Sequence, residues 1–336
     1  MGERFENILV IGDGGWGTAL AVLLAEKGCR VHQWSAFPEY AKEMQRTRLN
    51  KKFLPGVKLP RKMRISGLVE DIPRDIGLIV SAVPTLYLRA SLNKLAVALN
   101  GGAPVVSGTK GIENSTLLRA SQIIHETLGA RRGVAVISGP SHAEEVARHL
   151  PTSVALGGKN PGLLRALQRL FSTDRFRVYT NSDITGVDLG GALKNVIAIA
   201  GGMSDGLGYG DNSKSALLTR GLVEIARLGV KMGGRRQTFF GLAGLGDLMT
   251  TCFSRHSRNR AVGESIGRGK RLDKILSDSE MVPEGVWTVR SVVDLARKYR
   301  VEMPITEQVY KVLFEGLKPE EGVHKLMTRK FKSESG

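Results

Sequence analysis

Near its start the chain reads Ile8-Leu-Val-Ile-Gly-Asp-Gly-Gly-Trp-Gly17, an apolar run that leads directly into a G-x-G-x-x-G pattern. The β-rich residues 8–11 predict a buried parallel strand. Residues 18–27 have the composition of a helix that stops at Gly28, and residues 31–34 predict a second strand. A strand, a glycine-rich turn, a helix and a strand within about 30 residues form the context of a dinucleotide-binding fingerprint.

Each glycine of this fingerprint has a distinct expected role. Gly12 makes the tight turn, Gly14 lets the backbone approach a pyrophosphate, and Gly17 lets the helix pack on the strand. The free N–H groups and the dipole of the helix N-terminus then receive the phosphates. An incidental glycine-rich turn is the alternative, and the strands on both sides disfavour it. The sequence therefore predicts a dinucleotide cofactor.

The residues after the second strand bear on which dinucleotide is bound. NAD-selective sites place Asp or Glu there to hold the ribose hydroxyls. Here Ser35, Ala36 and Phe37 follow, and the first acid is Glu39. We therefore expect no carboxylate to repel a 2′-phosphate, and we expect NADP or NAD as cofactor, with NADPH favoured.

The rest of the first half alternates predicted strands and helices. Residues 76–80, 105–107 and 134–137 read as strands that end in small, polar or glycine-rich segments, and ligands of open α/β sheets bind at those ends. Lys110 is the one charged side chain in its turn, so it either meets an anionic or carbonyl oxygen or is an exposed loop lysine. His142 fits a helix start better than a catalytic role.

The second half is helical in pattern. From about residue 188, apolar residues recur at helical spacing, with Lys194 and Asn195 at the edge of the stripe. Lys194 either lies in an interdomain cleft or reaches the surface. Residues 201–208 are expected to form a flexible turn, and residues 216–228 another helix. We expect an α/β Rossmann-type doubly wound sheet over residues 1–187 and an all-α domain over residues 188–336.

Composition limits the class of protein. The 336 residues suffice for about two domains, and 42% hydrophobic and 24% charged residues exclude a disordered chain. Cys29 and Cys252 do not make a disulfide framework and fit a reducing compartment. We recognise no signal peptide, no membrane-length apolar run and no metal-ligand spacing, so we expect a cytoplasmic protein without membrane insertion or a metal site.

The chain carries a formal charge of +17, with 49 Lys+Arg against 32 Asp+Glu. Two basic concentrations lie at residues 51–64 and 254–271. Such clusters bind nucleic acid or phosphorylated small molecules, or keep a protein soluble. No aromatic residues are interleaved in the second cluster, which argues against base stacking. Taken alone, the clusters leave a nucleic-acid contact, an anionic membrane surface, a small phosphorylated ligand and a solvated face open.

Several longer motifs occur in one order along the chain. They lie at residues 12–21, 110–113, 138–141, 191–199, 205–208, 219–221, 244–248 and 257–260. In these motifs the chain resembles NAD(P)-dependent glycerol-3-phosphate dehydrogenase of the soluble bacterial type, from about residue 7 to residue 316. The resemblance implies a Rossmann domain, a helical domain and a homodimer. It also places the two basic clusters near the cofactor and substrate positions, so we expect small phosphorylated ligands and no nucleic-acid partner. It also implies reversible reduction of dihydroxyacetone phosphate to sn-glycerol 3-phosphate, which feeds glycerophospholipid synthesis.

The same resemblance assigns roles to individual residues. Lys194 matches the catalytic lysine that protonates and deprotonates the C2 oxygen, and Asp247 matches the acid beside it. The residues that match substrate-binding positions are Lys110, Gly139, Ser141, Lys194, Asn195, Asp247, Ser257, Arg258 and Asn259. Beyond the fingerprint glycines, those that match cofactor-binding positions are Gly15, Trp16, Ala36, Lys110, Ala143, Arg258, Val282 and Glu284.

Two residues depart from the family pattern. Asp13 stands where a small apolar residue is usual, and Ala36 stands where a basic or imidazole side chain is common.

Two other interpretations of the function stay open at this point. One is a related two-domain Rossmann dehydrogenase that acts on a 3-hydroxy acid, and the other is a cofactor-sensing or nucleic-acid-binding protein on the same fold.

Overall fold

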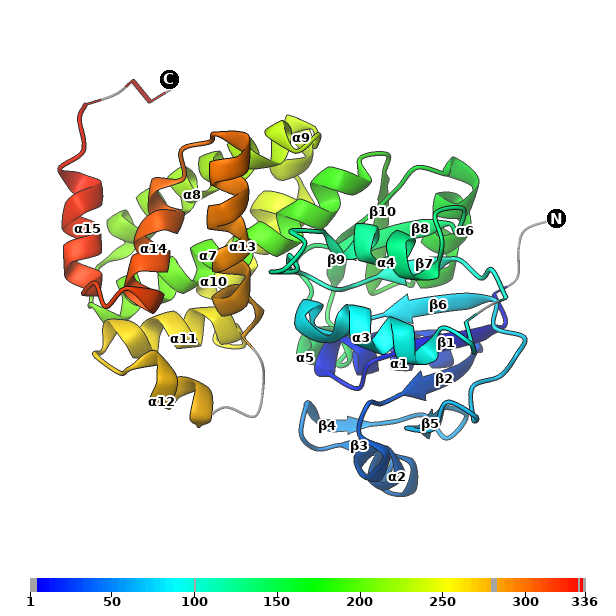
Figure 1. Cartoon of the computed structure of the whole chain (residues 1–336). Coiled ribbons are helices and arrows are strands. Elements are labelled where there is room, and N and C mark those ends of the chain that lie inside the picture. The colour runs from blue at the N-terminus through cyan, green and yellow to red at the C-terminus, as the bar shows by residue number, and fades with distance from the viewer. Residues whose placement is uncertain (1–4, 100, 279–282, 332, 335–336) are drawn as a thin grey trace.

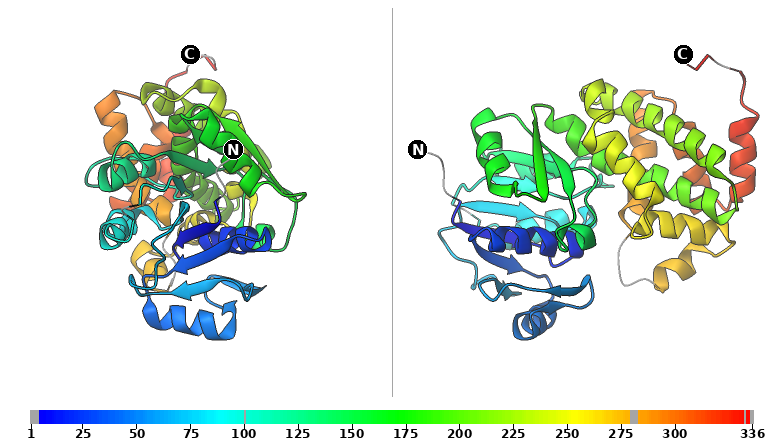
Figure 2. Two further views of the ribbon diagram at one scale, coloured as in Figure 1. Left: turned by 90° about the vertical axis from the view of Figure 1, so that its right-hand side faces the viewer. Right: turned by 180° about the vertical axis from the view of Figure 1, so that it is seen from behind.

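The computed structural model describes residues 5–99, 101–278, 283–331 and 333–334. The chain forms a sheet-containing N-terminal part and a helical C-terminal part that lie side by side (Figure 1). The views in Figure 2 show that the helical part lies at one end of the sheet. The predicted fold class, a Rossmann-type sheet followed by an all-α part, is confirmed.

The main sheet has eight strands in the order β10-β9-β8-β7-β6-β1-β2-β5. Neighbouring strands are parallel except for β8 and β9, which are antiparallel. The strands are β1 (Asn7–Ile11), β2 (Arg30–Trp34), β5 (Arg64–Ser66), β6 (Leu78–Ser81), β7 (Val105–Ser107), β8 (Val134–Ser138), β9 (Thr152–Gly158) and β10 (Phe176–Asn181). A separate antiparallel pair joins β3 (Leu49–Asn50) and β4 (Leu54–Lys58). The chain order reverses between β1 and β6, and this is where ligands bind in such sheets.

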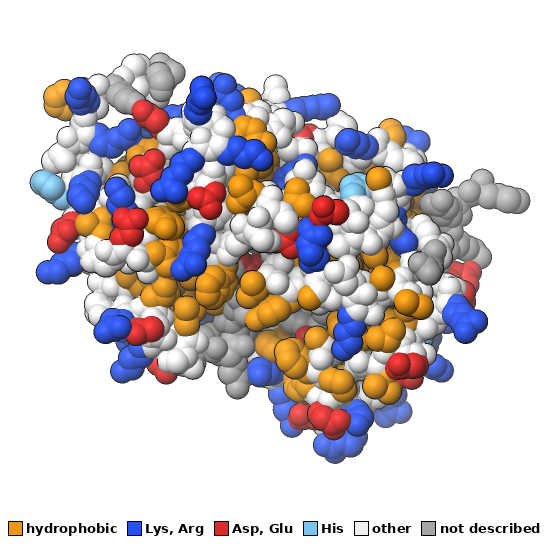
Figure 3. Space-filling view, viewed as in Figure 1, with side chains coloured by type: hydrophobic (Ala, Val, Ile, Leu, Met, Phe, Trp, Pro, Cys, Tyr) orange, Lys and Arg blue, Asp and Glu red, His pale blue; other side chains and the backbone are white. Residues whose placement is uncertain are grey.

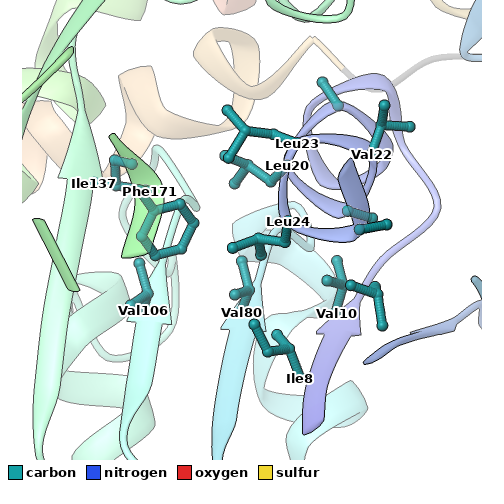
Figure 4. Close-up of a cluster of buried hydrophobic side chains, with 14 of the residues drawn as sticks. Ile8, Val10, Leu20, Val22, Leu23, Leu24, Val80, Val106, Ile137 and Phe171 are labelled. Atoms are coloured by element: carbon teal, nitrogen blue, oxygen red, sulfur yellow. The ribbon is translucent and has the colours of Figure 1, made fainter. Parts of the chain in front are cut away.

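Helices cover both faces of the sheet. On one face Leu20 and Leu24 of α1 (Gly15–Glu26) lie over β1 and β6, and Phe171 of α6 (Pro161–Phe171) lies against Val106 and Ile137 (Figure 4). On the other face α3 (Thr85–Leu95) and α4 (Ala120–Leu128) bury a second apolar layer. The remaining helices of this part are α2 (Pro38–Thr47) and α5 (Ala143–Val146).

The helical part is built around α7 (Ile184–Gly206). This helix starts two residues after β10, so the expected domain boundary between residues 187 and 188 falls in its first turn. Among the described helices, α7 alone is long and apolar enough to cross a membrane, but 94% of its most apolar window is buried inside the protein. Around it lie α8 (Asp211–Lys231), α9 (Arg236–Phe239), the π-helical turn η1 (Leu242–Gly246), α10 (Asp247–Phe253), α11 (Arg258–Gly267), α12 (Leu272–Ser277), α13 (Glu284–Tyr299), α14 (Pro304–Phe314) and α15 (Pro319–Met327).

The flexible turn expected at residues 201–208 is wrong, because α7 continues to Gly206. The glycines serve a close contact between α7 and α11. A Cβ on Gly202 would overlap the carbonyl oxygen of Arg260, and one on Gly263 would overlap that of Ile199. The two backbones therefore touch with no side chain between them.

Candidate active site

The fingerprint turn lies at the carboxyl ends of β1 and β6. Gly12 has a φ of 112°, and a Cβ there would lie 2.9 Å from the carbonyl oxygen of Ala82. A Cβ on Gly17 would lie 2.7 Å from the carbonyl oxygen of Gly12, which shows how closely α1 packs on this turn. Gly14, by contrast, has no atom within 4 Å of its hypothetical Cβ. Among the described residues the turn is therefore open at Gly14, and approach of a pyrophosphate there stays a prediction.

The N-terminus of α1 fits an anionic group. Gly14 is its N-cap residue and provides no side-chain hydrogen bond, and the first turn contains no acid. The first N–H groups of a helix lack partners within the helix and attract negative charge. Trp16 Nε1 is buried without a hydrogen-bond partner among the described residues. Gly15 approaches the backbone of Phe53 and the Ala143 side chain closely, so these predicted cofactor residues lie together.

The carboxyl end of β2 differs from our expectation. We expected no carboxylate there, but the Ser35 hydroxyl donates a hydrogen bond to Asp13 Oδ2 at 2.6 Å. The acid reaches this position from the fingerprint turn and not from β2 itself. Ala36, the next residue, is exposed. The premise that this edge of the sheet lacks a carboxylate is therefore wrong.

A buried charged cluster lies where the two parts of the chain meet. Lys110, beyond β7, donates to Asp247 Oδ2 at 2.7 Å, and Lys194 of α7 forms a short ion pair with Asp247 Oδ1. Lys194 Nζ also donates to the Thr251 hydroxyl at 2.6 Å. Lys194 and Asp247 are both buried. Two lysines from different parts of the chain thus share one carboxylate.

Burial and mutual attraction set the protonation of this cluster. Burial lowers the pKa of Lys194 to about 8, although the Asp247 carboxylate opposes that effect. Burial alone would raise the pKa of Asp247, but the ammonium groups of Lys110 and Lys194 hold it below its usual range. Burial and the nearby Lys194 charge lower the pKa of His142, which is the N-cap residue of α5, as predicted. Lys194 is therefore a buried amine whose pKa lies at about 8, well below that of an exposed lysine.

Polar groups beyond β8 border this cluster. Gly139 has a φ of 143°, and its carbonyl oxygen accepts hydrogen bonds from Ser141 Oγ at 2.8 Å and from Lys110 Nζ at 3.3 Å. Asn195 Nδ2 donates to the carbonyl oxygen of Lys110 at 3.2 Å. The structure thus brings Gly139, Ser141 and Asn195 to the two lysines.

The N-terminus of α11 comes to the same region. Ser257 caps this helix, its hydroxyl accepting from the Arg260 N–H at 3.2 Å. Asn259 Oδ1 accepts from the Gly285 N–H at 2.9 Å, and a Cβ on Gly285 would lie 2.8 Å from the carbonyl oxygen of Asn195. Arg258 is exposed and forms no ion pair or hydrogen bond with the described residues. An exposed guanidinium at a helix start that has no acidic residue in its first turn suits a phosphate.

Comparisons with known proteins agree with this geometry. The family descriptions "NAD-dependent glycerol-3-phosphate dehydrogenase N-terminus" and "C-terminus" match residues 7–163 and 183–324. The chain belongs to this family.

Individual relatives span the whole chain. Glycerol-3-phosphate dehydrogenase [NAD(P)+] of Carboxydothermus hydrogenoformans is 48% identical over 98% of this chain and 98% of its own. The enzyme of the same name from Geobacillus thermodenitrificans is also 48% identical, over 98% and 96%. The crystal structure of glycerol-3-phosphate dehydrogenase from Coxiella burnetii has a TM-score of 0.92 at 38% identity, covering 96% of this chain and 99% of that one.

Two predicted cofactor residues of this glycerol-3-phosphate dehydrogenase, Val282 and Glu284, have not yet been placed. Glu284, the first residue of α13, is half-buried at the start of α3, and its carboxylate accepts from the Thr85 N–H at 2.7 Å. Val282 lies outside the described residues.

Sequence reasoning missed two residues of the site. Thr251 contacts Lys194, and Ser138 Oγ donates to Asp247 Oδ2 at 3.4 Å. Thr251 follows Asp247 by four residues, so a helix predicted there would have placed both on one face. Ser138 ends β8, and its position at the carboxyl end of a strand was the available signal.

Proposed function

We propose that this chain catalyses the reversible reduction of dihydroxyacetone phosphate to sn-glycerol 3-phosphate with NADH or NADPH. The buried Lys194–Asp247–Lys110 cluster carries the proposal, because it places a lysine of lowered pKa beside the proposed cofactor edge of the sheet. Relatives that bear this name and match the full chain support it.

The proposed role of Lys194 is to move a proton at the C2 oxygen. In reduction its ammonium group donates a proton to the oxygen as negative charge develops there, and in oxidation the neutral amine takes that proton back. Asp247 and Thr251 hold the amine in place. The Gly12–Gly17 turn and the α1 N-terminus would hold a nicotinamide cofactor, which would supply the hydride to C2 in reduction and accept it in oxidation.

The proposed phosphate site is the start of α11. Arg258 provides a charged fork, and Asn259 and Ser257 provide neutral polar groups. Lys110, Gly139, Ser141 and Asn195 line the side nearer β7 and β8. Binding the phosphate at one end fixes C2 against Lys194, which lowers the entropic part of the barrier.

We further propose a homodimer that acts in the cytoplasm and supplies glycerophospholipid synthesis. The product is the backbone on which such lipids are built, and the two cysteines, Cys29 and Cys252, are unpaired. Sedimentation of the purified protein tests the dimer. Growth of a deletion strain with and without added glycerol 3-phosphate tests the metabolic role.

The reaction is tested by oxidation of NADH and of NADPH with dihydroxyacetone phosphate. Lys194→Ala should abolish turnover while cofactor binding persists, and Lys231→Ala, at the exposed end of α8, should match the parent enzyme. Arg258→Ala should mainly raise KM for the phosphorylated ketone. Turnover with a 3-hydroxy acid but not with the ketone phosphate would contradict the proposal, as would a Lys194→Ala enzyme with parental activity.

A further inference from the structure

Asp13 projects its carboxylate to the carboxyl end of β2. Ser35 directly follows this strand, and its N–H bonds to the Ser66 carbonyl oxygen of the neighbouring β5 at 2.9 Å. The Ser35 hydroxyl donates to Asp13 Oδ2 at 2.6 Å. The carboxylate therefore occupies the edge where Rossmann domains hold the adenosine ribose, although it comes from another segment.

The backbone that carries Asp13 is held from three sides. Asn50 Nδ2 donates to the Asp13 carbonyl oxygen at 2.7 Å, and Thr18 Oγ1 donates to the same oxygen at 3.2 Å. Gln33 Nε2 donates to the Gly12 carbonyl oxygen at 3.0 Å. These buried contacts fix the backbone of the turn, and the Ser35 hydroxyl holds the carboxylate itself. Asp13 Oδ1 accepts no hydrogen bond from another described side chain, so this oxygen is left for a ligand.

We propose that Asp13 makes this enzyme selective for NAD(H) over NADP(H), its carboxylate accepting a hydrogen bond from the ribose 2′-hydroxyl and repelling a 2′-phosphate. The inference rests on the proposed cofactor site. It reverses the expectation, drawn from the sequence, that NADPH is the favoured cofactor. A carboxylate opposite a phosphate weakens binding, because like charges meet in a site that is partly removed from water.

The basic residues 51–64 act in the opposite direction. Lys52 is the member whose charge acts on Asp13, and it is exposed, with its Nζ 5.5 Å from the centre of the Phe53 ring. An exposed cation is screened by solvent and salt, whereas Asp13 is only 8% exposed. Burial raises the pKa of Asp13, and the Ser35 hydroxyl and the Lys52 charge oppose that effect. The proposal therefore rests on the position of the carboxylate at the ribose edge of the sheet.

Calorimetric titration of the full chain with ADP-ribose and with its 2′-phosphate tests this without any turnover. The parent enzyme should bind ADP-ribose at least about tenfold more tightly. Asp13→Asn keeps the shape of the side chain and removes its charge, and Asp13→Ser also shortens it. Both should reduce the preference at least about tenfold. Glu39→Gln, which removes the exposed acid that follows β2 in sequence, should leave it unchanged.

The outcomes separate this inference from the reaction. Equal or tighter binding of the 2′-phosphate by the parent enzyme overturns it, as does an unchanged preference in folded Asp13→Asn protein. Failure to bind either nucleotide overturns the cofactor site and the inference together. Normal binding selectivity without oxidation of NADH by dihydroxyacetone phosphate overturns the proposed reaction and leaves the role of Asp13 standing.

Discussion

The Glu284 carboxylate accepts a hydrogen bond from the backbone N–H of Thr85, with 2.7 Å between Oε1 and N. Thr85 is the first residue of α3, on the sheet, and Glu284 is the first residue of α13, in the helical part. The residue before α3 is Pro84, which provides no side-chain cap. One part of the chain therefore supplies the helix cap that the other lacks. Burial raises the pKa of Glu284, so the contact also includes a carboxyl removed from water.

Replacing Glu284 should separate its hydrogen bond from its charge. Glu284→Ala leaves the Thr85 N–H without this partner, and we expect a loss of about 1–3 kcal/mol in the free energy of unfolding. Glu284→Gln retains an acceptor oxygen, and its stability should stay within about 0.5 kcal/mol of the parent. Urea denaturation without cofactor measures both. Equal stability of the Ala variant and the parent would show that the hydrogen bond contributes nothing.

Thr251 should tune the proton affinity of Lys194. Its hydroxyl accepts a hydrogen bond from the ammonium form at 2.6 Å, and Thr251→Val removes that acceptor. The pKa of Lys194 should then fall, moving the alkaline limit of ketone reduction down by about one pH unit. Thr251→Ser restores the hydroxyl and should restore the parental profile. A Val variant with the parental pH profile and lower kcat would assign Thr251 a packing role only.

The two directions of the reaction should respond oppositely to pH. The pKa of Lys194 is lowered to about 8, so the ammonium form needed for reduction is present below that pH and is lost above it. The kcat for reduction should therefore fall as the pH rises through about 8, whereas the kcat for oxidation should rise. Rates at saturating substrates over pH 6–10 measure this. Parallel profiles in both directions would contradict the assignment of Lys194.

Gly263 should tolerate no side chain. A Cβ there would overlap the Ile199 carbonyl oxygen of α7, so Gly263→Ala must push the two helices apart. We expect a loss of about 3 kcal/mol in stability. Gly210→Ala provides the matched control, because that position has open space and a φ of −82°. Thermal unfolding compares the two, and similar melting temperatures would mean that the helix pair adapts easily.

Local patterns predicted the first half of the fold well. Residues 8–11 and 31–34 form β1 and β2, and the predicted strands at 105–107 and 134–137 form β7 and β8. Residues 8–11, 105–107 and 134–137 are almost wholly apolar, so the signal lies within a few neighbouring residues. β2 is less apolar, because it contains Arg30, His32 and Gln33. The strands β3, β4, β5, β9 and β10 were not predicted.

What could not be predicted depends on long-range contacts. Glycines in residues 201–208 suggested a turn because they are poor helix formers alone, and only the partner helix α11 explains why α7 accepts them. The Asp13 carboxylate reaches the end of β2 through the shape of a turn 22 residues away from Ser35 in sequence. The motifs of the family located Lys194 and Asp247, but the shared use of Asp247 by two lysines is visible only in three dimensions.

The bare backbone contact between α7 and α11 has a consequence for the size of the substrate. Lys194 is carried by one of these helices and the proposed phosphate residue Arg258 by the other. No side chains lie between the two helices at Gly202 and Gly263, so direct backbone contact fixes the distance between the helices there. We therefore expect the distance between the proposed binding groups for the ketone oxygen and the phosphate to be fixed, and a substrate one carbon longer to fit poorly.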